Sequence, residues 1–193
     1  MEPERIRQDF ARIGRRLFTE GLLVANFGNM SVRTGGGFAI TRTGACLDTP
    51  GNPVLVPLEG AAPPEASNEH QVHCEVYHKT SYRALVHAHP PHAVALSLLL
   101  DSITPLDCEG IMFCPVIPVC GGEPGSRDLA RNVTEQLIGS RVTIARGHGT
   151  FARGNTLDEA YMLTSLAEHS CRVLVLSGLF RDTARGSSGE ERR

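Results

Sequence analysis

The sequence is poor in lysine, has no tryptophan and contains no long hydrophobic run. Lys79 is the single lysine among 193 residues, which disfavours chemistry that passes through a lysine imine. The longest apolar stretches, 93–100 and 173–179, are shorter than the roughly 20 residues of a bilayer-spanning helix. No basic segment followed by an apolar run opens the chain. From these absences we expect a cytoplasmic protein with no membrane partner.

Strong net charge and nucleotide-binding motifs are also absent. The formal net charge is -2 at pH 7 and the arginines are dispersed, so no basic patch typical of nucleic-acid binding occurs, and no nucleic-acid partner is expected. Neither a P-loop nor a GxGxxG fingerprint is present, which disfavours nucleotide chemistry. The six cysteines form no CxxC pair, and a chain of this size needs no disulfide framework, so we expect reduced thiols.

Length and composition indicate one globular domain. With 41% hydrophobic residues, the chain can bury a substantial core, and 193 residues are typical of a single domain. We expect this domain to occupy residues 1–181 and the polar segment 182–193 to be a disordered tail.

Hydrophobic periodicity and turn residues predict an α/β fold. Helices are expected at 3–20, 68–79 with Ser67 as N-cap, 93–100, from 126 onward, and from a capping box of Thr156 and Glu159 to about 179. Strands are expected within 26–44, at 84–89 and at 141–146, a loop at 48–66, and strands and loops without helix at 101–125. This order predicts a three-layer α/β/α fold with a central, largely antiparallel sheet flanked by helices.

Three histidines lie close together in the segment "LVHAHPPHAVALS". Because side chains alternate along a strand, His87 and His89 share one face and could bind one metal ion. The alternative is that both merely form hydrogen bonds at the end of a core strand. Pro90 and Pro91 end the strand at this point, and His92, which lies beyond them, is expected to point elsewhere.

A metal site of this kind needs a further ligand from elsewhere in the chain. Three imidazoles leave one coordination position open for water or substrate. His148 is the best candidate, because it lies between two glycines directly after a predicted buried strand, where metal and substrate can approach the backbone. His70 and His169 lie in predicted helices without such a context and are expected to be surface or packing residues.

Glu69 is the candidate carboxylate. It precedes His73 by one helical turn and falls in the predicted first turn behind Ser67, where free backbone amides also favour an anion. A first-turn glutamate is equally typical of a surface group that complements the helix dipole.

Five motifs together resemble the class II aldolase and adducin family of sugar-phosphate enzymes. They are, in order, "GNMSVR", "TRTG", "SNEHQVH", "VHAHP" and "RGHGTF", and the resemblance extends over about residues 17–176. It implies that His87, His89 and His148 are zinc ligands. It also implies that Glu69 caps the metal in the absence of substrate and acts as a base once substrate displaces it. Manganese, iron or cobalt could occupy the same ligands.

The same resemblance assigns a phosphate-binding role to Asn29, Thr43, Gly44, Ser67 and Asn68. Short polar side chains, glycine amides and a helix N-terminus can form a neutral site for a phosphate dianion. Asn29, preceded by a glycine, is also typical of a hairpin turn, and the two interpretations do not exclude each other.

The resemblance implies a reaction and an assembly. A metal-dependent enzyme of this type cleaves a ketose 1-phosphate to dihydroxyacetone phosphate and an aldehyde through an enediolate, and Glu69 transfers the proton. Family members are usually homotetramers with active sites between subunits, so we expect a homotetramer whose partner is a small phosphorylated sugar.

The sequence departs from the fuculose-type aldolases of the family in its tyrosines. Those enzymes use one tyrosine in the loop after the metal strand and another near the C-terminus, and Tyr77, Tyr82 and Tyr161 are not so placed. The loop "PLDCEGIMF" instead offers Asp107 and Glu109. Glu109 lies about where methylthioribulose-1-phosphate dehydratases carry an acid-base glutamate, although it could also be a solvent-facing loop carboxylate.

Alternatives to the aldolase therefore stay open. A dehydratase, or a decarboxylase on the same fold, would use Glu109. Epimerases of the family carry aspartate where this chain has Glu69, and this difference disfavours an epimerase. A non-catalytic adducin-like interaction module would have lost its metal ligands, whereas all three histidines and Glu69 are present. The sequence therefore favours an enzyme.

Overall fold

The computed structural model describes residues 3–187. The helices are α1 Pro3–Thr19, α2 His70–Lys79, α3 Pro91–Ser97, α4 Cys108–Phe113, α5 Arg127–Gly139 and α6 Leu157–Ser187. The strands are β1 Asn29–Thr34, β2 Gly37–Ile40, β3 Val54–Pro57, β4 Ala84–Ala88, β5 Ser102–Ile103, β6 Ile117–Cys120, β7 Val142–Ala145 and β8 Gly149–Gly154.

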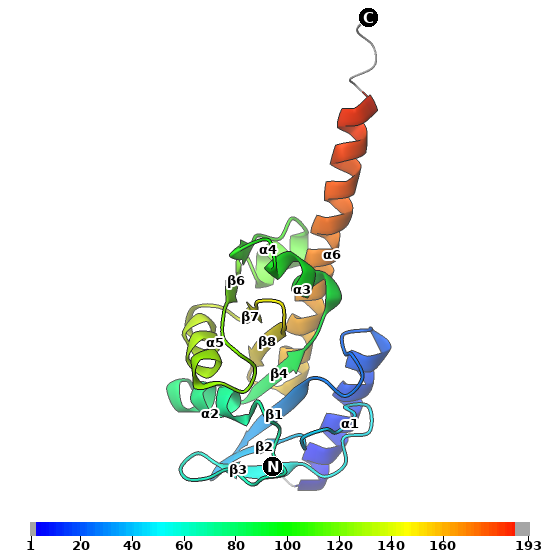
Figure 1. The fold of residues 1–193 in the computed structure, drawn as a ribbon. Coiled ribbons are helices and arrows are strands. Elements are labelled where there is room, and N and C mark those ends of the chain that lie inside the picture. The colour runs from blue at the N-terminus through cyan, green and yellow to red at the C-terminus, as the bar shows by residue number, and fades with distance from the viewer. Residues whose placement is uncertain (1–2, 188–193) are drawn as a thin grey trace, which may run out of the picture.

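Within the described residues the strands form one eight-stranded sheet in the order β3-β2-β1-β4-β8-β7-β6-β5. Every neighbouring pair is antiparallel except β6 and β7, which are parallel. Helices α2 and α5 pack on one face of the sheet, and α1, α3 and α6 pack on the other (Figure 1). The predicted three-layer α/β/α fold with a largely antiparallel sheet is thus confirmed.

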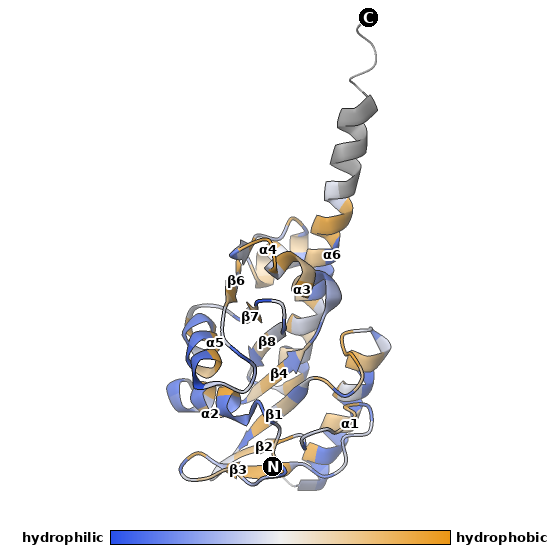
Figure 2. Cartoon of the chain, in the orientation of Figure 1, coloured by the Kyte–Doolittle hydropathy of each residue, from blue (hydrophilic) through white to orange (hydrophobic). Residues whose placement is uncertain are grey.

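The alternation of side chains along β4 divides the core into two layers. Leu85 packs with Val72 of α2, whereas Val86 packs with Phe10 of α1. Residues two positions apart share a face of a strand, so His87 points to the same side as Leu85. In Figure 2, α2 and α5 are mostly hydrophilic, while β1 and β4 beneath them are largely hydrophobic. The fold therefore places His87 between the sheet and the layer of α2 and α5.

Two elements occur where the sequence analysis expected none. The predicted loop 48–66 contains β3, whose alternating burial and terminal Pro57 suit an edge strand. The predicted helix-free segment 101–125 contains α4, which begins after Asp107 because the Asp107 carboxylate accepts a hydrogen bond from the Gly110 N–H at 2.8 Å. Sequence composition favoured loops in both segments. Pairing with β2 instead produces strand β3, and the Asp107 cap produces helix α4.

The start of α2 also differs from the prediction. The helix begins at His70, with Glu69 rather than Ser67 as the N-cap, and Glu69 makes no capping hydrogen bond with its side chain. Ser67 instead accepts a weak hydrogen bond from the Glu69 N–H at 3.4 Å. Glu69 therefore lies ahead of the first turn, and its side chain is free to turn toward the sheet.

The start of α3 and the end of α6 also differ from the predicted positions. Helix α3 begins at Pro91 rather than 93, because the Glu168 carboxylate of α6 accepts hydrogen bonds from the His92 and Ala93 N–H groups. Helix α6 continues to Ser187, past the expected end near 179, so residues 182–187 of the predicted disordered tail are helical. Residues 188–193 of that predicted tail lie outside the described residues. None of the helices in the described part of the chain is long and apolar enough to cross a membrane.

Candidate metal and phosphate site

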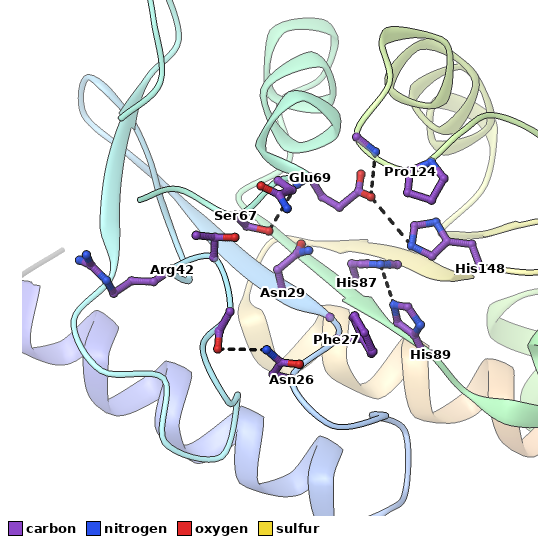
Figure 3. A pocket seen from close by; sticks show the side chains of 15 residues that line it. Asn26, Phe27, Asn29, Arg42, Ser67, Glu69, His87, His89, Pro124 and His148 are labelled. Carbon is purple, nitrogen blue, oxygen red and sulfur yellow. Dashed lines mark hydrogen bonds and ion pairs between the residues drawn. The ribbon is translucent and has the colours of Figure 1, made fainter. Parts of the chain in front are cut away.

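A cavity of about 390 Å³ opens beside the ends of β1 and β4 (Figure 3). It is lined by Asn26, Phe27, Gly28, Asn29, Arg42, Thr43, Gly44, Ser67, Asn68, Glu69, His87, His89, Pro124, Gly125 and His148. Every residue predicted to bind metal and every residue predicted to bind phosphate is in this set. Six separate segments of the chain therefore converge on one site.

Three imidazoles converge at one end of the cavity. His87 lies in the buried strand β4. His89 directly follows that strand, with its Nε2 atom 3.1 Å from His87 Nε2. His148 lies in the tight turn between β7 and β8, and β8 pairs with β4. One nitrogen from each of the three rings lies within 4.8 Å of the others. This is the arrangement that three histidine ligands of a single metal ion require.

The charge state of the rings suits metal binding. Burial, together with the neighbouring histidines, lowers the pKa of His87 well below its usual value and lowers the pKa of His89 to about 4. His87 Nδ1 lies 3.0 Å from the Thr150 carbonyl oxygen, and a neutral ring donates its N–H there. Its Nε2 lone pair is then directed toward His89 and His148, as in metal sites whose second ring nitrogen bonds a backbone carbonyl.

Glu69 faces these imidazoles across the cavity. Its Oε1 atom accepts a hydrogen bond from the Gly125 N–H at 3.1 Å and lies 3.9 Å from His148 Nε2. Burial raises the pKa of Glu69, and the Gly125 hydrogen bond opposes that shift. Glu69 Oε2 and His148 Nδ1 are buried and have no hydrogen-bond partner within the described residues. Polar atoms that are buried without a partner cost free energy. Carboxylate oxygens and imidazole nitrogens are ligands for divalent transition metals, so the residues present fit such a metal.

The predicted phosphate-binding residues line the same cavity, and one of them, Asn29, lies directly opposite His87 on the neighbouring strand. The Thr43 N–H donates to the Glu65 carbonyl oxygen at 2.9 Å, and the Ser67 N–H donates to the Thr41 carbonyl oxygen at 3.3 Å. These bonds hold the segment after β2 against the segment before α2. The hydroxyl groups and amides of both segments therefore border the same space as the metal-binding nitrogens.

Close backbone approach requires glycine at two positions beside the histidines. A Cβ atom at Gly28 would lie 2.9 Å from the His87 carbonyl oxygen, and the φ angle of Gly28 is +108°. A Cβ atom at Gly149 would lie 2.3 Å from the Ala88 carbonyl oxygen and 3.0 Å from His87 Cε1. Glycine at both positions thus lets β1 and β8 approach the ends of the histidine strand.

Several residues of the cavity were missed by the sequence analysis. Phe27 is 57% exposed at the cavity mouth and stacks on His89, with ring centroids 6.0 Å apart. Gly125 supplies the amide that holds Glu69, and its φ angle is +71°. The only sequence signal for Gly125 was a glycine- and proline-rich loop before a helix, which is common in loops without function. No sequence pattern singled out Arg42 or Asn26 as a functional residue.

The remaining candidates lie elsewhere. Glu109 is on α4 and lines a different pocket, together with Tyr161 and His169 of α6. His92 Nδ1 contacts Glu168 Oε1 at 2.6 Å, as expected for a residue outside the metal cluster. His70 Nδ1 is 2.9 Å from the Ser67 carbonyl oxygen and is not part of the cavity lining.

Comparison with known proteins agrees with this geometry. The chain matches the family described as Class II Aldolase and Adducin N-terminal domain over residues 8–175. It is 31% identical over 170 residues to an L-fuculose phosphate aldolase of Methanococcus maripaludis, which covers 86% of this chain and 93% of that protein. It is 30% identical over 142 residues to a 3-oxo-tetronate 4-phosphate decarboxylase of Cupriavidus necator, which covers 67% of this chain and 64% of that protein.

The fold has a similar counterpart among solved structures. The crystal structure of L-fuculose-1-phosphate aldolase from Thermus thermophilus superposes with a TM-score of 0.90 at 42% sequence identity. The match covers 93% of this chain and 97% of that one. The chain belongs to the class II aldolase and adducin family.

Proposed function

We propose that this protein is a metal-dependent class II aldolase that cleaves a ketose 1-phosphate to dihydroxyacetone phosphate and an aldehyde. The observation that carries the proposal is the single cavity in which three imidazoles and Glu69 lie beside polar side chains and backbone amides. The similarity to sugar-phosphate aldolases supports the same substrate class.

His87, His89 and His148 would hold the metal, and Glu69 would cap it before substrate binds. Zinc suits three imidazoles, although manganese, iron or cobalt could take the same ligands. When bound, such a metal supplies Lewis-acid polarisation of the substrate carbonyl and its neighbouring hydroxyl group. The neutral imidazoles leave the full charge of the cation available for this task.

Glu69 would transfer the proton. Cleavage breaks the bond between the carbon beside the carbonyl and the next carbon. The hydroxyl group on that next carbon gives its proton to water, and the group becomes the aldehyde. The carbon beside the carbonyl keeps the electron pair and gains a proton from Glu69. Because burial raises the pKa of Glu69, its carboxyl group holds that proton at a higher pH than an exposed glutamate does.

The phosphate group would be held in the same cavity by Asn29, Thr43, Gly44, Ser67 and Asn68. All five line the cavity. Their amide and hydroxyl groups can donate hydrogen bonds to a dianion without adding positive charge beside the metal. This arrangement would fix the distance between the phosphate and the carbon that receives the proton.

A dehydratase or decarboxylase on the same fold is the alternative, with Glu109 as the acid or base. The similarity to a 3-oxo-tetronate 4-phosphate decarboxylase supports the decarboxylase alternative. Glu109 lines a pocket apart from the metal cluster, so within one chain it does not border the reacting atoms. Glu109 could therefore act only at the site of a neighbouring copy. The adducin-like alternative is disfavoured because the full ligand set is retained.

We further propose that the protein assembles as a homotetramer. Large apolar side chains are exposed on α4, directly before α4 and directly after α3. They are Leu98 at 61%, Leu99 at 80%, Leu106 at 51%, Ile111 at 54% and Met112 at 68% exposure. Exposed apolar groups of this size favour association with another surface. Light scattering coupled to size-exclusion chromatography measures the mass of the assembly, and a monomer would reject this part of the proposal.

The main test combines metal analysis with an assay of a panel of ketose 1-phosphates. We expect stoichiometric divalent metal and release of dihydroxyacetone phosphate that stops after chelation and returns when metal is added back. Metal without cleavage of any member of the panel would turn the proposal toward dehydration or decarboxylation. Purified protein that binds no divalent metal would favour the adducin-like module.

A further inference from the structure

A buried chain of polar side chains leads from the core to Asn29 in the phosphate site. His73 Nε2 lies 2.6 Å from Asn29 Oδ1, and His73 Nδ1 lies 2.6 Å from Ser31 Oγ. Ser31 Oγ in turn lies 2.7 Å from the Tyr77 hydroxyl group. Tyr77 is 2% exposed, and His73 and Ser31 are completely buried. None of these three residues lines the cavity, so they have no contact with a ligand there.

The direction of these hydrogen bonds follows from the buried hydroxyl group at the far end. Ser31 is the only hydrogen-bond partner of the Tyr77 hydroxyl within the described residues, so the phenol donates to Ser31 Oγ. Ser31 then donates to His73 Nδ1, which accepts. The reverse direction would leave the Tyr77 O–H buried without an acceptor, which costs more than an unused acceptor lone pair.

The ring of His73 can therefore donate only through Nε2. Burial, with a smaller contribution from His70, lowers the pKa of His73 to about 3, so the ring carries one N–H at neutral pH. That N–H lies on Nε2 and donates to Asn29 Oδ1. The Asn29 carbonyl oxygen is thus bound to the core, and its amide group Nδ2 has no partner within the described part of the chain.

We propose that His73 is a positioning residue that fixes the orientation of the Asn29 amide, so that its NH₂ group and not its carbonyl oxygen faces the anion site. An asparagine presents a donor or an acceptor depending on a rotation of its terminal amide. The dianion of a phosphate monoester has no proton to donate and can only accept hydrogen bonds, so the wrong orientation of the amide would oppose its binding. This inference rests on the proposed function for the assignment of the cavity as a phosphate site.

The test measures the affinity of the purified full-length protein for inorganic phosphate by calorimetry. His73→Leu removes the donor, while His73→Gln keeps an amide N–H near the position of Nε2. We expect His73→Leu to raise the Kd for phosphate by roughly 10- to 100-fold, the usual loss for a hydrogen bond to a charged group, and His73→Gln to stay close to wild type. Metal content and far-ultraviolet circular dichroism must match across the variants.

Ser31→Ala provides a second variant in case His73→Leu does not fold. It removes the hydroxyl group that makes Nδ1 an acceptor, so the preference for the Nε2–H form weakens and the Kd for phosphate rises by less than in His73→Leu. Wild-type affinity in both His73→Leu and Ser31→Ala would overturn the proposal. Equal loss in His73→Gln and His73→Leu would also overturn it, because it would indicate a role in packing only.

The proposal and the proposed function fail in different ways. If wild type binds phosphate and His73→Leu does not, but no ketose phosphate is cleaved, the role of His73 stands and the aldolase reaction is rejected. If wild type binds no phosphate, both are rejected. In an active enzyme, His73→Leu should raise KM for the ketose phosphate with little change in kcat, because the phosphate is remote from the bond that breaks.

Discussion

Asn29 and His87 are directly opposed on the adjacent antiparallel strands β1 and β4. One residue belongs to the proposed phosphate site and the other to the proposed metal site. Directly opposed side chains on one sheet face have Cβ atoms roughly 5 Å apart. The register of this one strand pair therefore sets the spacing between the two halves of the substrate site.

Removing one imidazole should remove the metal. We expect His89→Ala to weaken metal affinity by more than about 100-fold, because even residues that only support a ligand contribute roughly 10- to 100-fold. Elemental analysis by mass spectrometry measures the bound metal. His92→Ala, three positions further along the chain, is the matched control and should keep its metal, since His92 contacts Glu168 outside the cluster. Retained stoichiometric metal in His89→Ala would contradict the ligand assignment.

Glu69→Gln should separate proton transfer from metal binding. The amide keeps the size of the side chain but cannot exchange a proton, so kcat should fall by about 10² to 10⁴, the usual contribution of a general acid or base. Metal content should stay at the wild-type level because the three histidines remain. Glu75→Gln on the same helix, outside the cavity lining, should leave turnover unchanged. An active Glu69→Gln enzyme would refute the proposed proton donor.

Glu109→Gln distinguishes the aldolase from the dehydratase or decarboxylase. Because Glu109 lies on α4 and does not line the metal cavity, we expect release of dihydroxyacetone phosphate to persist in the variant. The measurement is a coupled assay of that product across the ketose phosphate panel. If turnover is lost while metal and phosphate binding persist, the alternative gains support, with Glu109 serving the site of a neighbouring subunit.

Acid should destabilise the protein partly through His73. Its pKa of about 3 in the folded state lies below the usual 6.5, so the unfolded chain takes up a proton first as pH falls. Stability from this group is complete above about pH 6.5 and is lost between there and about pH 3, at up to about 1.4 kcal/mol per pH unit. Urea unfolding at about pH 7, 5.5 and 4.5 measures this slope. His73→Gln should show a shallower slope, and an unchanged slope would contradict the assignment.

Gly149→Ala should disturb the pairing of β4 and β8. The added Cβ atom would lie 2.3 Å from the Ala88 carbonyl oxygen, so the strands must separate. Overpacking of this kind costs about 1–3 kcal/mol of unfolding free energy, and metal affinity should fall with it because β4 and β8 flank the histidines. Gly139→Ala at the end of α5 meets no atom within 4 Å and is the control, expected to leave stability and metal unchanged or slightly improved. Wild-type stability in Gly149→Ala would contradict the prediction.

Local sequence patterns were sufficient to predict many of the helices and strands. The spacing of Ile6, Phe10 and Ile13 predicted α1, and Ser126 predicted the start of α5, where its hydroxyl group accepts from the Leu129 N–H at 3.0 Å. The edge strand β3 and helix α4 were not predicted. Proline and glycine dominate both segments, and pairing with β2 and the Asp107 cap decided their structure.

The sequence alone determined which residue types could bind metal, because strand alternation places His87 and His89 on one face and glycines flank His148. A resemblance to a known family then selected Glu69 and the phosphate-binding residues. Only the tertiary structure decided that the Gly125 amide holds Glu69, that His73 bonds Asn29, and that Glu109 lies apart from the cavity. These contacts join segments distant in the chain, and their geometry depends on the order and register of the strands, which no local pattern encodes.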